Sequence, residues 1–115
     1  MLFGAGCISE RAPATAPTIS DRCGVPVSAV GAGKALVLIS NFAFFPETLH
    51  VAAGTSVTWV NCDTPDQHTS TSDGDVWSSP LLSPSDAFAF TFAQAGTFPY
   101  HCSPHPFMKA AVVVQ

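Results

Sequence analysis

The amino-acid sequence predicts an all-β fold, an antiparallel sandwich or small barrel of seven or eight short strands. Several apolar runs alternate with polar residues at a period of two, and clusters of Gly, Pro, Asp and Ser separate these runs. Ten prolines and eight glycines among 115 residues also favour turns over long helices. No segment carries ten or more residues of helical period, although 70–82 is ambiguous and could hold a helical turn.

Three strands are expected in the first half of the chain. The run 35–39 is continuously aliphatic and has the length of a strand. The runs 49–53 and 57–60 place large apolar side chains at every second position, as expected for strands with one buried face. A turn at 53–55 separates these two strands.

Three further strands are expected in the second half. Phenylalanine occupies every second position of 88–92, and the runs 97–102 and 110–114 follow it. Turn-forming residues lie before and between these strands, at 73–75, 83–86 and 94–96.

The strand directions can be counted along the chain. If 35–40 runs up, then 48–53 runs down and 55–60 runs up again. With an odd number of passes between residues 61 and 93, strand 97–102 also ends at the top. The segments that follow residues 60 and 102 are therefore expected to meet at one end of the sandwich.

Length and composition limit the class of protein. A chain of 115 residues suits one domain, and 47% hydrophobic against 10% charged residues is too apolar for a disordered tail. No apolar run approaches the ~20 residues that span a bilayer. The net charge of −4 argues against a nucleic-acid partner, which needs a basic patch.

The first 33 residues are expected to form an export and linker segment, and 34–115 the folded domain. Cys7 follows a short apolar stretch that resembles the end of a bacterial lipoprotein signal. A lipid anchor at Cys7 and an ordinary N-terminus with a spare thiol are both open interpretations. Residues 9–20 are rich in Ala, Thr and Pro, as in a flexible linker. The expected location is the periplasm or the cell surface.

The number of cysteines suggests one disulfide. Four cysteines in a small domain are typical of an oxidising compartment. If Cys7 carries lipid and Cys102 is used elsewhere, Cys23 and Cys62 remain as a candidate pair. This pairing rests on parity alone.

The segment 102–108 carries the strongest chemical signal. Cys102, His105 and Met108 offer a thiolate, an imidazole and a thioether within one short loop. Such a loop joins strands that are only ~5 Å apart, so its side chains can converge. His68 lies in the loop that the strand count places at the same end. A Cys and two His with a weak axial Met form the ligand set of blue copper sites.

Each of these residues also has a simpler interpretation. Cys102 is in phase with the apolar face of its strand, so it could be a core residue or half of a disulfide. His68 could be a solvated loop residue, and Met108 could fill the core. Copper is favoured because all three ligand types fall in one loop with His68 at the same end.

Other site chemistries fit less well. A structural zinc site would need a second Cys or His pair. A Cys–His hydrolase would need an oxyanion site and a substrate cleft, for which the sequence offers no signal.

Three parts of the sequence, 55–61, His68 and 96–108, together resemble the cupredoxins, the blue copper proteins of the amicyanin and plastocyanin family. The resemblance covers about residues 34–115. It departs from the family in the loop 61–68, which is a residue longer and contains Cys62.

This resemblance implies an eight-stranded Greek-key sandwich that holds one copper ion. His68, Cys102 and His105 would be the in-plane ligands, and Met108 the axial ligand. Asn61 would tie the His68 loop to the Cys102 loop, which is a way to orient ligands.

Two residues beside the ligands would tune the thiolate. The backbone N–H of Thr69 would donate a hydrogen bond to the sulfur of Cys102. Pro104 has no N–H to donate. The thiolate would therefore accept one such bond instead of two, which favours the oxidised state.

Four protein ligands imply an electron carrier and not an enzyme, because no position is open for substrate. His105 would be the electron port, and redox proteins would dock near it transiently on a monomer. The apolar docking patch would comprise Pro104, Pro106 and Phe107, with Phe42, Phe44 and Phe45 as further candidates if they are not core residues. A copper-handling protein of a resistance or delivery system is the main alternative, and a disulfide-linked adhesion sandwich ranks last.

Overall fold

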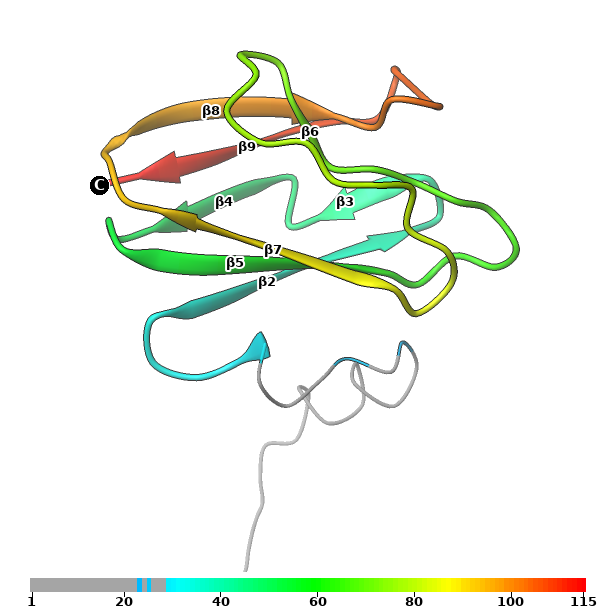
Figure 1. Cartoon of the computed structure of the whole chain (residues 1–115), viewed down its shortest axis with the longest axis horizontal. Coiled ribbons are helices and arrows are strands. Elements are labelled where there is room, and N and C mark those ends of the chain that lie inside the picture. Colours follow the sequence, from blue (N-terminus) through cyan, green and yellow to red (C-terminus); the bar gives the residue numbers. More distant parts are fainter. Residues whose placement is uncertain (1–22, 24, 26–28) are drawn as a thin grey trace, which may run out of the picture.

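Two β-sheets pack face to face in the computed structural model, which describes residues 23, 25 and 29–115 (Figure 1). The predicted all-β sandwich of about eight strands is confirmed. The strands are β2 (Lys34–Ser40), β3 (Ala43–Phe45), β4 (Thr48–Val51), β5 (Thr55–Asn61), β6 (Thr71–Ser72), β7 (Ala87–Phe92), β8 (Gly96–His101) and β9 (Lys109–Val114).

Both sheets are mixed, so the prediction of an antiparallel sandwich is wrong in this detail. The first sheet has the order β3-β2-β5-β7 and the second the order β4-β9-β8-β6. The pairs β2–β5 and β4–β9 are parallel, and the other pairs are antiparallel. The reason is that the chain crosses from the first sheet to the second between β3 and β4. β5 then returns to lie beside β2 in the same direction, as the count of strand directions requires.

The two strands that were not predicted are the shortest ones. β3 has three residues and β6 has two, so neither is long enough to show a period of two. The ambiguous segment 70–82 contains β6 and the isolated bridge partner Ser78 instead of a helical turn, and Leu82 pairs with His68.

The core between the sheets is aromatic and extends to one end of the sandwich. The rings of Trp59 and Trp77 stack with centroids 5.6 Å apart, and Tyr100 packs edge-on against Trp59 at 5.5 Å. Cys102 and Met108 belong to the same buried cluster, with 0% and 2% of their surface exposed. Two of the candidate ligands therefore form the end of the hydrophobic core.

A second, smaller cluster lies on the other face of β5. Val60, which alternates with Trp59, packs there with Val25 and Ala29. A disulfide joins Cys23 to Cys62, as parity suggested. The packed region therefore begins upstream of the boundary predicted at residue 34.

The remaining features predicted for the N-terminal segment, Cys7 as a lipid site and 9–20 as a linker, lie outside the described residues. Within the part of the chain that the structure describes, no helix combines the length and apolar character needed to cross a bilayer.

Candidate metal centre

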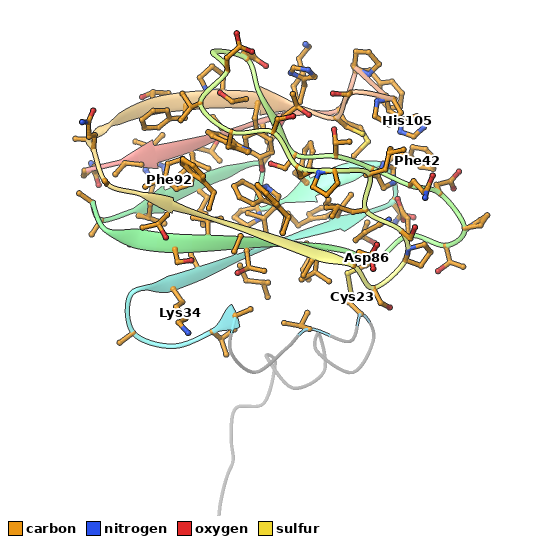
Figure 2. The ribbon with its side chains drawn as sticks, viewed as in Figure 1. Cys23, Lys34, Phe42, Asp86, Phe92 and His105 are labelled. Atoms are coloured by element: carbon orange, nitrogen blue, oxygen red, sulfur yellow. A yellow bond between two sulfur atoms is a disulfide. The ribbon has the colours of Figure 1, made fainter. Side chains whose placement is uncertain are left out.

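The two loops predicted to meet do so at one end of the sandwich. His68 follows β5, Cys102 follows β8, and His105 lies in the turn between β8 and β9. One donor atom from each of these three residues lies within 4.8 Å of the other two. The Cys102 sulfur is 3.6 Å from the Nδ1 atoms of both His68 and His105. Figure 2 shows His105 at the end of the molecule opposite Phe92.

Backbone hydrogen bonds fix the loop that carries three of the four candidates. The amide of His105 donates to the carbonyl oxygen of Cys102 at 3.1 Å, and the amide of Met108 donates to that of His105 at 2.9 Å. The Cys102 amide donates to the Met108 carbonyl oxygen at 3.1 Å. These bonds close a compact turn that directs the Met108 side chain into the core.

The remaining candidate, His68, is held by a different segment. Its backbone exchanges two hydrogen bonds with Leu82, of 3.2 and 2.8 Å, and its side chain is fully buried. A solvated loop histidine, the simpler interpretation of His68, is therefore wrong.

These residues fit a soft metal ion such as copper. Cys102 is a free, buried thiol, which excludes the disulfide alternative for this residue. The Nε2 atom of His68 contacts Asp63, so its Nδ1 atom remains for a metal on the side of the sulfur. Thiolate sulfur and imidazole nitrogen at this spacing form a donor set that selects copper over the hard divalent ions.

Comparison with known proteins agrees with this donor set. The family of copper binding proteins of the plastocyanin/azurin type matches residues 32–115. The chain belongs to this family. It is 32% identical to amicyanin of Paracoccus denitrificans over 118 residues, covering 98% of this chain and 86% of that protein. Amicyanin-alpha of Methylorubrum extorquens is 34% identical over 89 residues, covering 73% of this chain and 74% of the relative.

Solved cupredoxin structures share the fold. A reduced amicyanin variant superimposes with a TM-score of 0.69 at 33% identity, covering 76% of this chain and 88% of that structure. A purple cupredoxin from Nitrosopumilus maritimus gives a TM-score of 0.66 at 28% identity, covering 71% and 100%. This cupredoxin is therefore a copper-binding, blue-copper electron-transfer protein.

The hydrogen bond that the family resemblance implies between Thr69 and the Cys102 sulfur is present. The amide of Thr69 donates a hydrogen bond to this sulfur at 3.4 Å. Pro104, which has no amide hydrogen, lies in the exposed part of the same loop.

The role expected for Asn61 is wrong. Its Nδ2 atom donates to the carbonyl oxygens of Asp66 at 2.9 Å and Leu82 at 2.8 Å, and its Oδ1 atom accepts from the Asp63 amide. Among the hydrogen bonds of residues 29–115, none joins this side chain to the Cys102 loop. Asn61 braces the His68 loop against the neighbouring segment instead, because it lies at the base of that loop.

Three hydroxyl groups make the link that Asn61 does not. The Ser103 amide donates to Oγ1 of Thr69 at 2.8 Å. The Thr71 hydroxyl lies 2.8 Å from that of Thr69 and 2.9 Å from that of Ser103. Sequence reasoning missed Thr71 and Ser103, and the only available signal was a run of hydroxyl residues after His68.

Asp63 was also missed, although it touches a candidate ligand. Its Oδ2 atom is 2.8 Å from Nε2 of His68, and its carboxylate accepts from the amides of Asn41 at 2.7 Å and Phe42 at 3.0 Å. Burial raises the pKa of Asp63, but the two amides and His68 outweigh it, so the pKa lies below its usual value. The carboxylate is therefore held in its charged form.

Aromatic rings cover the outer side of the site. Phe42 lies edge-on against His68 at 5.1 Å and His105 at 4.9 Å, and it stacks with Phe107 at 6.5 Å. Phe107 is 70% exposed. Phe44 is buried and packs on Tyr100, so it is a core residue.

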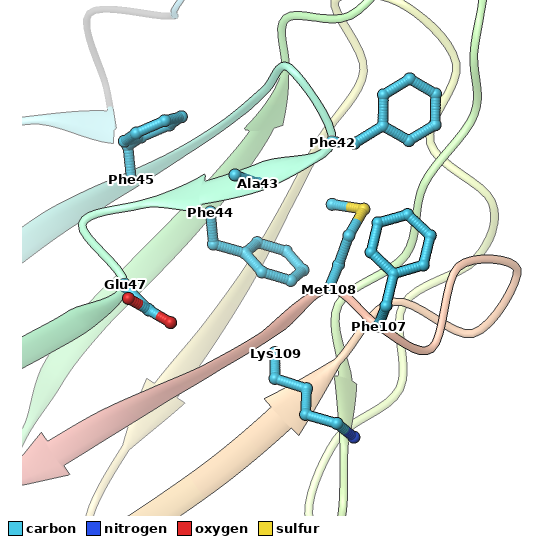
Figure 3. A pocket seen from close by; sticks show the side chains of 8 residues that line it. All are labelled: Phe42, Ala43, Phe44, Phe45, Glu47, Phe107, Met108 and Lys109. Carbon is cyan, nitrogen blue, oxygen red and sulfur yellow. The ribbon is translucent and has the colours of Figure 1, made fainter.

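A pocket of about 240 Å³ adjoins this aromatic group, and Figure 3 shows the side chains that line it, Phe42 and Phe107 among them. Its lining combines six apolar residues with one acidic and one basic residue: Phe42, Ala43, Phe44, Phe45, Phe107, Met108, Glu47 and Lys109.

Proposed function

We propose that His68, Cys102, His105 and Met108 hold the copper ion of this electron carrier. The observation that supports this proposal is the approach of three N and S donor atoms to within 4.8 Å of one another around a free, buried thiol. A bound copper ion supplies a couple that gains and loses one electron. Met108 joins the set because backbone hydrogen bonds close its loop onto Cys102 and its side chain is buried in the same cluster as Cys102.

The protein's contribution is to keep these side chains in one arrangement in both oxidation states. His68 and Met108 are packed in the core, and backbone hydrogen bonds fix both loops. A donor set held in this way needs little rearrangement when its charge changes. Four protein ligands also leave no open position for a substrate, so we propose a carrier and not an enzyme.

Electrons would enter and leave at His105, the half-buried member of the set. Pro104, Pro106 and Phe107 are exposed around it and offer an apolar surface. A small apolar patch suits short-lived encounters with redox proteins, which bury little area. We propose that the carrier acts as a monomer, because this patch must stay free for its partners.

The proposed location is outside the cytoplasm. The Cys23–Cys62 disulfide supports it, because disulfides persist in oxidising compartments. A lipid anchor at Cys7 remains part of the proposal. Mass spectrometry of the protein from a membrane fraction would detect an acylated Cys7 peptide, and an unmodified peptide there would exclude the anchor.

One equivalent of Cu(II) added to metal-free protein with a reduced Cys102 tests the assignment. We expect an intense visible thiolate-to-copper band and a reversible one-electron voltammogram. Cys102→Ser should remove the band while its circular dichroism stays that of the wild type. Met108→Leu should keep the band and shift the potential. A colourless wild-type protein would contradict the site. Irreversible voltammetry with rapid copper transfer to a chelator would favour copper handling.

A further inference from the structure

The turn between β2 and β3 has an uncommon backbone conformation. Asn41 and Phe42 both lie in the left-handed region, with φ of 55° and 57°. A side chain with a Cβ atom pays a steric cost there, and bulky residues such as Phe rarely adopt this conformation. Strain of this kind persists only where surrounding contacts fix it, and it is concentrated at functional sites.

The contact that fixes this turn is the carboxylate of Asp63. The amide of Asn41 donates to Oδ1, and the amide of Phe42 donates to Oδ2, at 2.7 and 3.0 Å. Consecutive amides that converge on one anion form a small anion-binding concavity. The two strong hydrogen bonds offset the cost of the left-handed conformation.

The same carboxylate reaches the metal centre. Its Oδ2 atom also lies 2.8 Å from Nε2 of His68. The turn that it holds places the ring of Phe42 against the imidazoles of both His68 and His105. Figure 3 shows this ring beside Phe107 and above Met108. The Asp63 side chain therefore contacts His68 directly. Through its hydrogen bonds to the backbone of residues 41 and 42, it also holds the Phe42 ring that covers His68 and His105.

We propose that Asp63 is a positioning residue that couples the Phe42 cap to the orientation of His68. It keeps the proton of the neutral imidazole on Nε2, which leaves Nδ1 for the metal. It also holds the 41–42 turn, so that the Phe42 ring covers the outer side of the two imidazoles and hinders access of water and chelators. The inference rests on the proposed role of His68 and His105 as ligands.

The first test uses metal-free protein. Nitrogen-15 NMR of the histidine rings should show His68 with its ring proton on Nε2. In Asp63→Ala this preference should be lost. Exchange of the Asn41 and Phe42 amide hydrogens should become at least about tenfold faster, which is the factor for losing a hydrogen bond to a charged group.

Matched variants separate positioning from loss of charge or fold. Asp66→Asn removes one charge from the same loop, and the Asp66 side chain contacts neither imidazole among the described contacts, so it should leave both readouts unchanged. Asp63→Asn has the size of the wild-type residue and should fold if Asp63→Ala does not. It should still lose part of the amide protection, because an amide accepts less strongly than a carboxylate.

The second test measures copper release to an excess of chelator. Phe42→Ala and Asp63→Ala should each accelerate release several-fold, whereas Phe42→Leu should remain close to the wild type. If Asp63 acts through the cap, the double variant should be little faster than either single one. Fully additive effects would overturn the coupling, and so would unchanged His68 tautomers and amide exchange in Asp63→Ala. Failure of the wild type to bind copper would contradict the proposed function but not the metal-free results.

Discussion

The amide of Thr69 donates a 3.4 Å hydrogen bond to the sulfur of Cys102, across 33 positions of sequence. This bond joins the segment after β5 to the end of β8, which are the two parts of the chain that supply the candidate ligands. A donor that faces a thiolate stabilises its negative charge and lowers the electron density that it can give to a metal. The sulfur is therefore a point where the surrounding backbone sets the redox potential.

Pro104→Ala should raise the reduction potential of the copper-loaded protein. The substitution restores an amide hydrogen in the Cys102 loop, and a second donor near the sulfur stabilises the reduced state. A differential effect of about 1.4 kcal/mol corresponds to roughly 60 mV for a one-electron couple. Voltammetry measures this shift. Pro106→Ala, in the exposed part of the same loop, is the control and should move the potential little; an unchanged or lower potential in Pro104→Ala would refute the argument.

Thr69→Val should destabilise the metal-free protein by about 0.5–1.5 kcal/mol, since the part-buried amide of Ser103 loses its acceptor. Valine keeps the shape of threonine and the backbone bond to Cys102, but it leaves the Ser103 amide without the hydroxyl that accepts from it. Urea unfolding measures the difference. Thr69→Ser keeps the hydroxyl and should recover most of the stability, so equal losses in both variants would show that the hydroxyl link is unimportant.

Removal of the Cys23–Cys62 disulfide should lower stability by roughly 4 kcal/mol. The cross-link closes a long loop, with a sequence separation of 39, and so reduces the entropy of the unfolded chain. The double variant Cys23→Ser/Cys62→Ser can be compared with the wild type by urea unfolding. A thiol reductant should lower the stability of the wild type to that of the variant and leave the stability of the variant unchanged. A loss well under 1 kcal/mol would show that the packing of Val25 and Ala29 suffices without the cross-link.

Tyr100 should make the protein less stable at alkaline pH. Burial raises the pKa of this phenol well above its usual value of 10.0, and the nearby Trp59 only partly offsets the rise. Above about pH 10 the unfolded chain loses this proton while the folded chain keeps it. Stability should therefore fall by up to about 1.4 kcal/mol per pH unit. Tyr100 is the single tyrosine of the chain, so the contribution can be isolated.

Tyr100→Phe tests this dependence directly. Among the described residues, the Tyr100 hydroxyl is buried without a hydrogen-bond partner, so its removal should cost less than about 1 kcal/mol at neutral pH. At about pH 11 the variant should be more stable than the wild type. Urea unfolding at both pH values measures this difference. An equal loss of stability in the two proteins between neutral pH and about pH 11 would contradict the prediction.

The strands that could be predicted are those with a long enough pattern. Phe88, Phe90 and Phe92 indicate β7 by their spacing alone, and the aliphatic run of β2 is equally clear. The parallel pairs could not be predicted from periodicity, because alternation defines a strand and one buried face but not its neighbour. The departure of β4 to the second sheet decides the pairing, and it depends on packing between distant segments.

The same distinction holds for the metal centre. Residue type and spacing are enough to predict His68, Cys102 and His105 as ligands, and the count of strand directions places their loops at the same end of the sandwich. Asp63, Thr71 and Ser103 have common side chains, and their roles depend on distances of 2.8–2.9 Å that arise only in the folded chain. Asn61 shows the converse error, since the family pattern suggested a partner that the backbone does not place within its reach.

The donors come from two segments that meet only in the folded chain, so the colour of the copper-loaded protein should report on folding. His68 is held by segments next to the first sheet, while Cys102 stands at the end of β8 in the second. A chain with only one sheet formed cannot bring the imidazole to the sulfur. The visible absorption expected of the copper-loaded protein should therefore develop only in molecules in which both sheets have formed. Its absorbance during refolding would follow the last step of folding without an added dye.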